Sequence, residues 1–309
     1  MITTSATAIR NILINYYGFS NPNLIIPEDG LEGNTYIVAS SELKYVVKVY
    51  HDNVRASLIA QFQHYLAETQ PFIPKIHTNI QAELATSVGN NTIVLSEFMD
   101  GRSIGWNSSY KSLSGKLTKT LAVAVASMHV RAQTITLGPT LDHPLSTKQL
   151  IVGALPKLSA QLATLDMVNV RQHMIHGDLA RENVFLHKSD VSVKSIIDFG
   201  DSHYDYVSYD LATLLTQIYI TKTWGIDFAG IRQFMDVYTH INILNETELQ
   251  AILPLMELRN RGLLNDIDKR ILVNEGDQET LISIKESLSV KIRLLEQHAL
   301  RLNTTLVQA

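Results

Sequence analysis

Two short polar stretches in the middle of the chain constrain it more than any other feature. Residues 176–183 read HGDLAREN, and residues 196–201 read IIDFGD. Each stretch places an acid beside a glycine or an amide, in a predicted turn next to short apolar strands at 184–187 and 193–197. The stretches are therefore either ordinary loops that close a hairpin, or two halves of one site that binds a metal ion and phosphate.

Asp178, Asn183 and Asp198 carry the side chains that phosphoryl transfer needs. The reaction uses an acid at the incoming hydroxyl group and a metal ion at the phosphates, and magnesium prefers carboxylate and amide oxygens. Asp178 and Asn183 have the spacing of a catalytic aspartate and a metal-binding asparagine, and Asp198 opens an Asp-Phe-Gly triplet after an apolar strand. A lone aspartate before a turn usually forms or caps that turn, but the combined pattern favours a catalytic site.

Composition excludes several classes of protein. The chain has 309 residues, a net charge of −4 and a pI near 6.3, so no broad nucleic-acid surface is expected. It has no cysteine, which excludes disulfides, a thiolate nucleophile and cysteine-ligated metals. Residues 1–18 lack the pattern of a signal peptide, and the longest apolar run, 121–128, is too short to span a bilayer. We expect a cytoplasmic protein with no nucleic-acid or membrane partner; the sequence leaves its oligomeric state open.

The pattern of elements predicts two parts, a sheet-rich one at 1–100 and a larger helical one at 101–309. Short β-branched and aromatic runs predict strands at 35–40, 44–50 and 91–99. Apolar residues at helical spacing predict helices at 1–18, 54–68, 113–128, 147–165 and 281–295. Asn245, with Glu248 three residues on, predicts the start of a further helix, which Pro254 is expected to kink.

Lys48 is the candidate cation of the amino-terminal part. Strand alternation in VVKVY places it on the face opposite Val47 and Val49. It is either an edge lysine that reaches solvent or the strand lysine that holds the α- and β-phosphates. Its position ahead of the HGDLAREN stretch, in the order that kinases use, favours the second interpretation.

Two backbone segments are further candidates for nucleotide binding. The amides of Gly33, Asn34 and Thr35 either cradle phosphate oxygens or belong to a plain hairpin, since the segment lacks a full GxGxxG pattern. The backbone between Glu97 and Met99, in LSEFMDG, either meets the adenine edge or is a simple hinge. Both interpretations of this connector can hold together.

These motifs together resemble one superfamily. HGDLARENVFL, IIDFGD and YDLATLL, with VVKVY and LSEFMDG upstream, resemble the aminoglycoside phosphotransferase and choline-kinase-like enzymes, which include homoserine and hydroxylysine kinases. The resemblance implies an α+β, protein-kinase-like, two-lobed fold, with a nucleotide-binding lobe at 1–100 and a catalytic and substrate-binding lobe at 101–309. It also implies phosphorylation of a hydroxyl group on a small molecule, with ATP (GTP possible) and Mg²⁺.

The resemblance also assigns roles to single residues. Asp178 matches the family's catalytic aspartate, Asn183 and Asp198 match its magnesium ligands, and Lys48 matches its phosphate-binding lysine. Asp210, in YDLA, matches an aspartate that supports the catalytic loop.

Two further positions bear on these assignments. His176 is expected to orient the loop through hydrogen bonds. Gln61 stands where the family's usual acidic partner of the lysine would align, so an amide replaces the ion pair unless Glu68 substitutes for it.

Two other functions are compatible with parts of this pattern. A protein kinase is disfavoured because HGD replaces HRD and no APE triplet follows the DFG triplet. A nucleotide-binding pseudokinase or regulator would require a lost base or metal ligand, and Asp178, Asn183 and Asp198 are all present. The working hypothesis for the acceptor is an amino alcohol or an amino acid such as homoserine, followed by an aminoglycoside.

The charged residues of the carboxy-terminal part leave the chemistry of the acceptor open. Acids could bind an ammonium group, and arginines could bind a carboxylate, although helical surfaces carry such charges routinely. The candidates are Asp201, Asp205, Glu257, Asp266, Asp268, Arg259 and Arg261.

Overall fold

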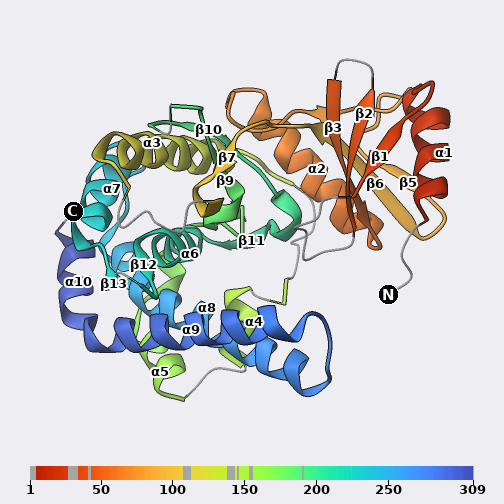
Figure 1. Ribbon diagram of the computed structural model, residues 1–309. Coiled ribbons are helices and arrows are strands. Elements are labelled where there is room, and N and C mark those ends of the chain that lie inside the picture. The colour runs from red at the N-terminus through yellow and green to blue at the C-terminus, as the bar shows by residue number, and fades with distance from the viewer. Residues whose placement is uncertain are drawn as a thin grey trace. The chain divides into compact units, whose positions relative to one another are not determined.

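A computed structural model of the chain divides into two compact units (Figure 1). The first unit comprises Met1–Asp100 with Ile135–Leu141 and Ser195–Ile197, and the second comprises Gly101–Thr134, Asp142–Lys194 and Asp198–Ala309. The structure describes residues 5–26, 34–40, 43–106, 113–137, 143–144, 146–152, 156–189, 191–223 and 225–308.

The first unit is built on an antiparallel sheet, which has six strands among the residues described. β3 lies between β2 and β6, and its register places Lys48 opposite Thr35 on one side and Val94 on the other. Along β3 the side chains alternate, so that Val47 and Val49 are buried and Lys48 is half-buried on the other face. The strands are β1 (Asn23–Ile25), β2 (Thr35–Ser40), β3 (Leu43–Tyr50), β4 (Ile76–His77), β5 (Thr86–Val88) and β6 (Asn91–Glu97).

One helix covers each face of this sheet. α1 (Ala6–Tyr17) begins after Ser5, whose hydroxyl accepts from the third amide on, and ends at Gly18, which has a left-handed φ of 71°. Its apolar stripe packs on the face that carries Val47 and Val49. α2 (Asn53–Ala67) covers the other face, where Ala56 and Ala60 pack against Val94. Because Val94 is the cross-strand neighbour of Lys48, the lysine lies on the face that α2 covers.

Helices form the core of the second unit. α6 is almost entirely buried, and α8 packs against it. α9 runs beside α8 (Figure 1). The helices are α3 (Gly115–Ala132), α4 (Thr147–Val152), α5 (Pro156–Thr164), α6 (Val207–Tyr219), α7 (Phe228–Ile241), α8 (Glu246–Leu272), α9 (Gln278–Gln297) and α10 (Ala299–Val307).

Short strands and 3₁₀ turns in the same unit carry the polar motifs. β8 pairs antiparallel with β11, which sets Ile175, just before HGDLAREN, opposite His203, just after IIDFGD. β9 lies between β7 and β10. The strands are β7 (Arg102–Ser103), β8 (Gln172–Ile175), β9 (Val184–Leu186), β10 (Val193–Ile196), β11 (His203–Tyr206), β12 (Ile220–Thr221) and β13 (Gly225–Ile226). The 3₁₀ turns are η1 (Ile104–Trp106), η2 (Met167–Asn169), η3 (Arg181–Asn183) and η4 (Phe199–Asp201).

The fold-class prediction is confirmed, and the elements differ from it mainly where they are short. Strands β2, β3 and β6 and helices α2, α3 and α9 agree with the predicted ranges to within a few residues. α8 begins after Asn245 with the predicted capping box to Glu248, and it remains helical through Pro254. The sequence interpretation missed β8, β11, β12 and β13, which are too short for a visible alternation. In the described part of the chain, none of the helices is long and apolar enough to cross a membrane.

Candidate active site

The turn after β8 presents Asp178, and Gly177 makes that turn possible. Gly177 has a φ of 82°, in the left-handed region that side chains disfavour. A Cβ placed on it would lie 2.3 Å from the carbonyl oxygen of Asp201. Glycine is therefore required both by the backbone conformation and by the close approach of the segment after the DFG triplet.

Asp210 stabilises this turn through hydrogen bonds to its backbone. It lies in the first turn of α6 with no exposed surface, and its carboxylate accepts from the backbone N–H groups of His176 (2.8 Å) and Gly177 (2.9 Å). Burial alone would raise the pKa of Asp210. The hydrogen bond and charge of His129, with a smaller contribution from His176, more than offset burial and lower it. A buried anion that accepts two loop amides is the contact expected of a residue that supports the loop.

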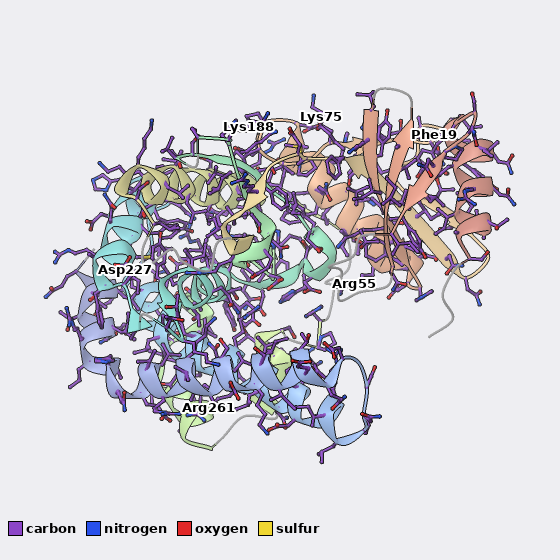
Figure 2. All side chains as sticks on the ribbon, viewed as in Figure 1. Phe19, Arg55, Lys75, Lys188, Asp227 and Arg261 are labelled. Atoms are coloured by element: carbon purple, nitrogen blue, oxygen red, sulfur yellow. The ribbon has the colours of Figure 1, made fainter. Side chains whose placement is uncertain are left out.

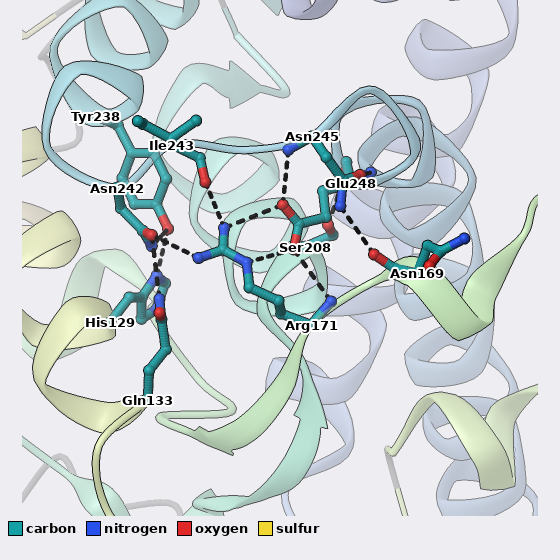
Figure 3. A network of polar contacts seen from close by, with 10 residues as sticks. All are labelled: His129, Gln133, Asn169, Arg171, Ser208, Tyr238, Asn242, Ile243, Asn245 and Glu248. Atoms are coloured by element: carbon teal, nitrogen blue, oxygen red, sulfur yellow. Dashed lines mark hydrogen bonds and ion pairs between the residues drawn. The ribbon is translucent and has the colours of Figure 1, made fainter.

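The Asp210 carboxylate is linked through His129 to a chain of hydrogen bonds, which Figure 3 shows from His129 to Arg171. Arg171 donates to Oδ1 of Asn242 at 2.9 Å, and Nδ2 of Asn242 donates to the Tyr238 hydroxyl at 2.7 Å. The Tyr238 hydroxyl lies 2.8 Å from Nδ1 of His129, and Nε2 of His129 lies 3.2 Å from Asp210. Both ring nitrogens of the buried His129 therefore have a partner.

Asn183 is turned towards Asp178. It ends the 3₁₀ turn η3, and its Nδ2 donates at 2.9 Å both to the backbone carbonyl of Asp178 and to Oδ2 of the Asp178 carboxylate. These two bonds fix the carboxylate that would receive a proton. They also use the amide nitrogen, so the Asn183 oxygen is the atom left for a metal ion.

Asp198 follows β10 in a strained conformation. Its φ is 67° in a non-glycine residue, a backbone state that costs about 1–2 kcal/mol and is concentrated at functional sites. Its Oδ1 accepts from Gly200 N–H at 3.2 Å, and the residue is exposed. The next side chain, Phe199, is buried, and its ring centroid lies 4.7 Å from that of His176. The stretches HGDLAREN and IIDFGD therefore pack against each other through these two rings.

The oxygens of Asn183 and Asp198 fit magnesium. Mg²⁺ is usually bound by one or two carboxylates and takes its other ligands from water and from substrate phosphates. An amide oxygen that is not engaged by its own loop, beside an exposed carboxylate, is a donor set of that kind. These two residues would hold the ion.

The electrostatics of Asp178 set its basicity. Its side chain is 31% exposed, and Oδ1 accepts from Nη2 of Arg259 on α8 at 2.8 Å. Burial raises the pKa of the Asp178 carboxyl, and the negative charges of Asp201 and Asp198 add to the rise. The Arg259 charge and, more weakly, His176 lower the pKa, but the net direction is upward. A carboxylate with a raised pKa is a better proton acceptor than an ordinary aspartate.

The amino-terminal unit carries the remaining candidates. Lys48, Asn34 and Thr35 lie at one end of the β2–β3 ladder, where Val49 N–H donates to the Asn34 carbonyl at 2.9 Å. Gly33 lies outside the described residues. The proposed nucleotide contacts of these four residues remain predictions.

The position predicted for Gln61 requires correction. Gln61 is exposed on α2, on the side away from the face that Ala56 and Ala60 line. Two positions on, Gln63 is buried, and its amide donates to the Pro74 carbonyl at 2.8 Å. Residues two apart on a helix point in nearly opposite directions, so the two amide side chains lie on different sides of α2.

The connector between Glu97 and Met99 has part of its backbone already engaged. The N–H of Glu97 donates to the Lys75 carbonyl at 2.9 Å, and the N–H of Phe98 donates to the Lys44 carbonyl at 3.3 Å. A base edge would therefore have to use other backbone groups, such as those of Met99.

Comparison with known proteins decides the family. Residues 24–236 match the phosphotransferase enzyme family, APH. This chain belongs to the APH family. It is a small-molecule kinase, as the sequence motifs predicted. A homoserine kinase of Bradyrhizobium sp. (strain ORS 278) is 24% identical over 250 residues, which cover 74% of this chain and 73% of that protein.

Solved structures show the APH-type fold over nearly the whole chain. A microcompartment-associated aminopropanol kinase superposes with a TM-score of 0.69 at 17% identity, covering 97% of this chain and 99% of that one. An amicoumacin kinase in complex with AMP-PNP, Ca²⁺ and Ami has a TM-score of 0.71 at 12% identity, covering 96% of this chain and 94% of that one. A spectinomycin phosphotransferase in complex with ADP and spectinomycin has a TM-score of 0.59 at 14% identity, covering 99% of both chains.

Sequence reasoning missed how Arg259 lies in the APH site. Arg259 and Arg261 were equal candidates, but Arg261 pairs with Glu296 on α9, partly exposed (labelled in Figure 2). Arg259 is buried and contacts Asp178. Helical spacing could have distinguished them, because Arg259 follows the apolar residues Leu255 and Met256 by four and three positions.

Proposed function

We propose that this chain transfers the γ-phosphoryl group of ATP, with Mg²⁺, to a hydroxyl group of a small, amine-bearing molecule. The observation that supports the proposal is the set of hydrogen bonds that orients the Asp178 carboxylate and its loop. Asn183 and Arg259 orient its carboxylate, and the loop that bears it is tied to the buried Asp210. A pseudokinase would have no use for an aspartate so oriented beside two magnesium-type oxygens.

The proposed reaction uses Asp178 as the proton acceptor. The acceptor oxygen forms a bond to the γ-phosphorus as the bond to the β–γ bridging oxygen breaks, and ADP leaves. Asp178 takes the hydroxyl proton, a role suited to its raised pKa. When bound by Asn183 and Asp198, Mg²⁺ would neutralise charge on the phosphates. Lys48 is proposed to bind the nucleotide phosphates.

Relatives support an amine-bearing acceptor. The homoserine kinase and the aminopropanol kinase are named for acceptors that carry both an amine and a hydroxyl group. Spectinomycin phosphotransferase extends the range to a larger molecule.

An acceptor screen that detects ADP release tests the proposal. Magnesium and ATP, with GTP as a second donor, would be incubated with amino alcohols, hydroxy amino acids and aminoglycosides. We expect at least one acceptor to stimulate ADP release, and Asp178→Asn to abolish the stimulation. Asp166→Asn, at an exposed aspartate in the same unit, is the matched control and should leave turnover unchanged. Tight ATP binding with no turnover on any acceptor would instead favour a regulator.

A further inference from the structure

Arg259 is a buried cation whose hydrogen bonds are incomplete. Its side chain is 4% exposed, and Nη2 donates to Oδ1 of Asp178 at 2.8 Å. Nε and Nη1 are buried and have no hydrogen-bond partner within the part of the chain that the structure describes. Two of the three guanidinium nitrogens therefore lack an acceptor in a place that water does not reach.

Such an arrangement is unfavourable unless a further partner completes it. A buried donor without an acceptor costs about 1–3 kcal/mol, and more when the group is charged. An arginine that served only to pair with Asp178 would be less unfavourable at the surface, where water would accept from its other N–H groups. Unpaired donors on a buried guanidinium beside the proton acceptor therefore point to an acceptor group supplied by a ligand.

A second buried cation, Lys291, interacts electrostatically with Arg259 and indicates that the ligand carries a negative charge. Lys291, on α9, is 7% exposed, and its Nζ donates to Oε1 of Gln217 at 2.7 Å. Burial, together with the charges of Arg259 and Arg181, lowers the pKa of Lys291 to about 7, although the charge of Glu182 acts in the opposite direction. Positive charges that repel one another in a desolvated region would be stabilised by an added anion.

Three of the acids that could have bound an ammonium group already have partners within the protein, and one of them, Asp201, lies 3.2 Å from Nε2 of His143. The buried carboxylate of Asp205 accepts from Thr147 N–H at 2.6 Å and from Tyr206 N–H at 2.8 Å. Asp268 pairs with Lys285 at 2.6 Å. Of the charged residues that the sequence left open for the acceptor, Arg259 is the one that touches Asp178 in the described structure.

We propose that Arg259 binds a carboxylate of the acceptor, so that the substrate class is a hydroxy amino acid rather than an amino alcohol or an aminoglycoside. The inference rests on the proposed kinase function and deepens it. Solvent reaches the ion pair from the side of Asp178, which is 31% exposed, against 4% for Arg259. A carboxylate that entered from that side would bind Nη1 next to the Nη2 that Asp178 holds, and the planar fork of arginine suits a planar carboxylate.

Matched pairs of acceptors that differ only by a carboxylate test the inference. L-homoserine would be compared with 3-amino-1-propanol, L-threonine with 1-amino-2-propanol, and L-serine with ethanolamine, by kcat/KM for ADP release. For the pair that fits the site, we expect the carboxylate-bearing member to be preferred by about 100-fold or more, because its absence leaves buried donors unpaired. In Arg259→Gln this ratio should fall towards one.

The ratio of kcat/KM within an acceptor pair distinguishes an Arg259 that binds the substrate carboxylate from an Arg259 that only positions Asp178. Because Arg259 touches Asp178, its replacement can lower kcat for every acceptor, but a purely positioning role would leave the ratio within a pair unchanged. Arg259→Lys keeps the charge and guards against a variant that does not fold; it should retain part of the preference. Arg261→Gln, at the partly exposed arginine paired with Glu296, is the matched control and should keep the full ratio.

The failures of the two proposals are distinguishable. If the amino alcohols are used as well as their carboxylated partners, the carboxylate inference is wrong and the kinase proposal stands. If no acceptor in the wider screen is turned over, the kinase proposal fails. In that case, the Tm measured with L-homoserine and with 3-amino-1-propanol still tests whether Arg259 binds a carboxylate. Stabilisation by L-homoserine alone that disappears in Arg259→Gln would support it, and equal or no stabilisation would overturn it.

Discussion

At the scale of single residues, His173 is buried in a way that disfavours its protonation. It lies on β8, where Nδ1 is 2.7 Å from the Met174 carbonyl, and Nε2 is buried without a partner among the described residues. Burial, with the nearby charge of His129, lowers the pKa of His173 from 6.5 to about 4. The unfolded chain therefore binds a proton on this ring at a pH where the folded chain does not.

This difference predicts a loss of stability in mild acid. The contribution of His173 to the free energy of unfolding is fully present above pH 6.5 and is lost as the pH falls towards about 4. At pH 5 the loss from this one ring is about 2 kcal/mol. His173→Asn keeps an N–H donor for the Met174 carbonyl but removes the titrating group. Urea unfolding at pH 8 and pH 5 should show a smaller drop in the variant; equal drops would contradict the assignment.

Single residues also show which parts of the site could be predicted. Asp178 and Asn183 were predictable because one short loop carries both, so their spacing in sequence determines their spacing in space. From the sequence, Gly177 was noted only as the residue that replaces the arginine of the HRD triplet of protein kinases. Its steric role depends on Asp201, which the fold brings back to it from 24 positions further along the chain. The contact of Arg259 with Asp178 likewise joins residues 81 positions apart, and no local pattern encodes it.

At the scale of elements, the start of α8 is tied to β8 through a buried acid. Glu248 is fully buried and completes the capping box with Asn245, while its two oxygens also accept from the backbone N–H, Nε and Nη2 of Arg171 (Figure 3). The capping box was visible in the sequence because it spans three residues. The ion pair was not, because Arg171 lies 77 positions earlier.

Glu248→Gln should therefore destabilise the fold more than an ordinary cap mutation. The amide cannot accept as many hydrogen bonds, and it leaves the Arg171 charge without its partner. Breaking a buried pair costs about 3–5 kcal/mol, and because the Arg171 side chain is 33% exposed we expect a loss on the order of 3 kcal/mol by chemical denaturation. The matched control is Glu246→Gln, an exposed acid in the same helical turn, which should change stability by about 0.5 kcal/mol or less. Equal effects of the two substitutions would contradict the assigned role of Glu248.

At the scale of the whole molecule, the candidate residues are divided between the two compact units. Lys48 belongs to the first unit, whereas Asp178, Asn183 and Asp198 belong to the second. The change from strands to helical stripes near residue 100 predicts two lobes, at 1–100 and 101–309, and these bounds stay a prediction; the first compact unit also takes in Ile135–Leu141 and Ser195–Ile197. The sequence could not predict which helices pack together, because the apolar stripes of α3, α8 and α9 are alike in pattern and their pairing is set by the tertiary fold.

The proposed metal ligands predict how nucleotide binding should affect global stability. A ligand that binds only the folded state at 100 times its Kd stabilises it by about 2.7 kcal/mol. We expect AMP-PNP to raise the Tm more with Mg²⁺ than with EDTA, because Asn183 and Asp198 would bind the ion that bridges to the phosphates. Asp198→Asn should keep the rise seen in EDTA and lose most of the magnesium-dependent part. Asparagine tolerates the left-handed φ of 67° at this position, so the backbone is not the cause of the change.

The exposed Asp166 again supplies the control for that experiment. Asp166→Asn removes one negative charge from the same unit and should keep the full magnesium-dependent rise. A general effect of charge on nucleotide affinity would reduce the rise in both variants, whereas loss of a metal ligand reduces it only in Asp198→Asn. If magnesium stabilises Asp198→Asn as strongly as the wild type, the ion does not bind at Asp198. The role of Asn183 as a magnesium ligand would then have to be tested separately with Asn183→Ala, because the Asp178 carboxylate would retain its contact with Arg259.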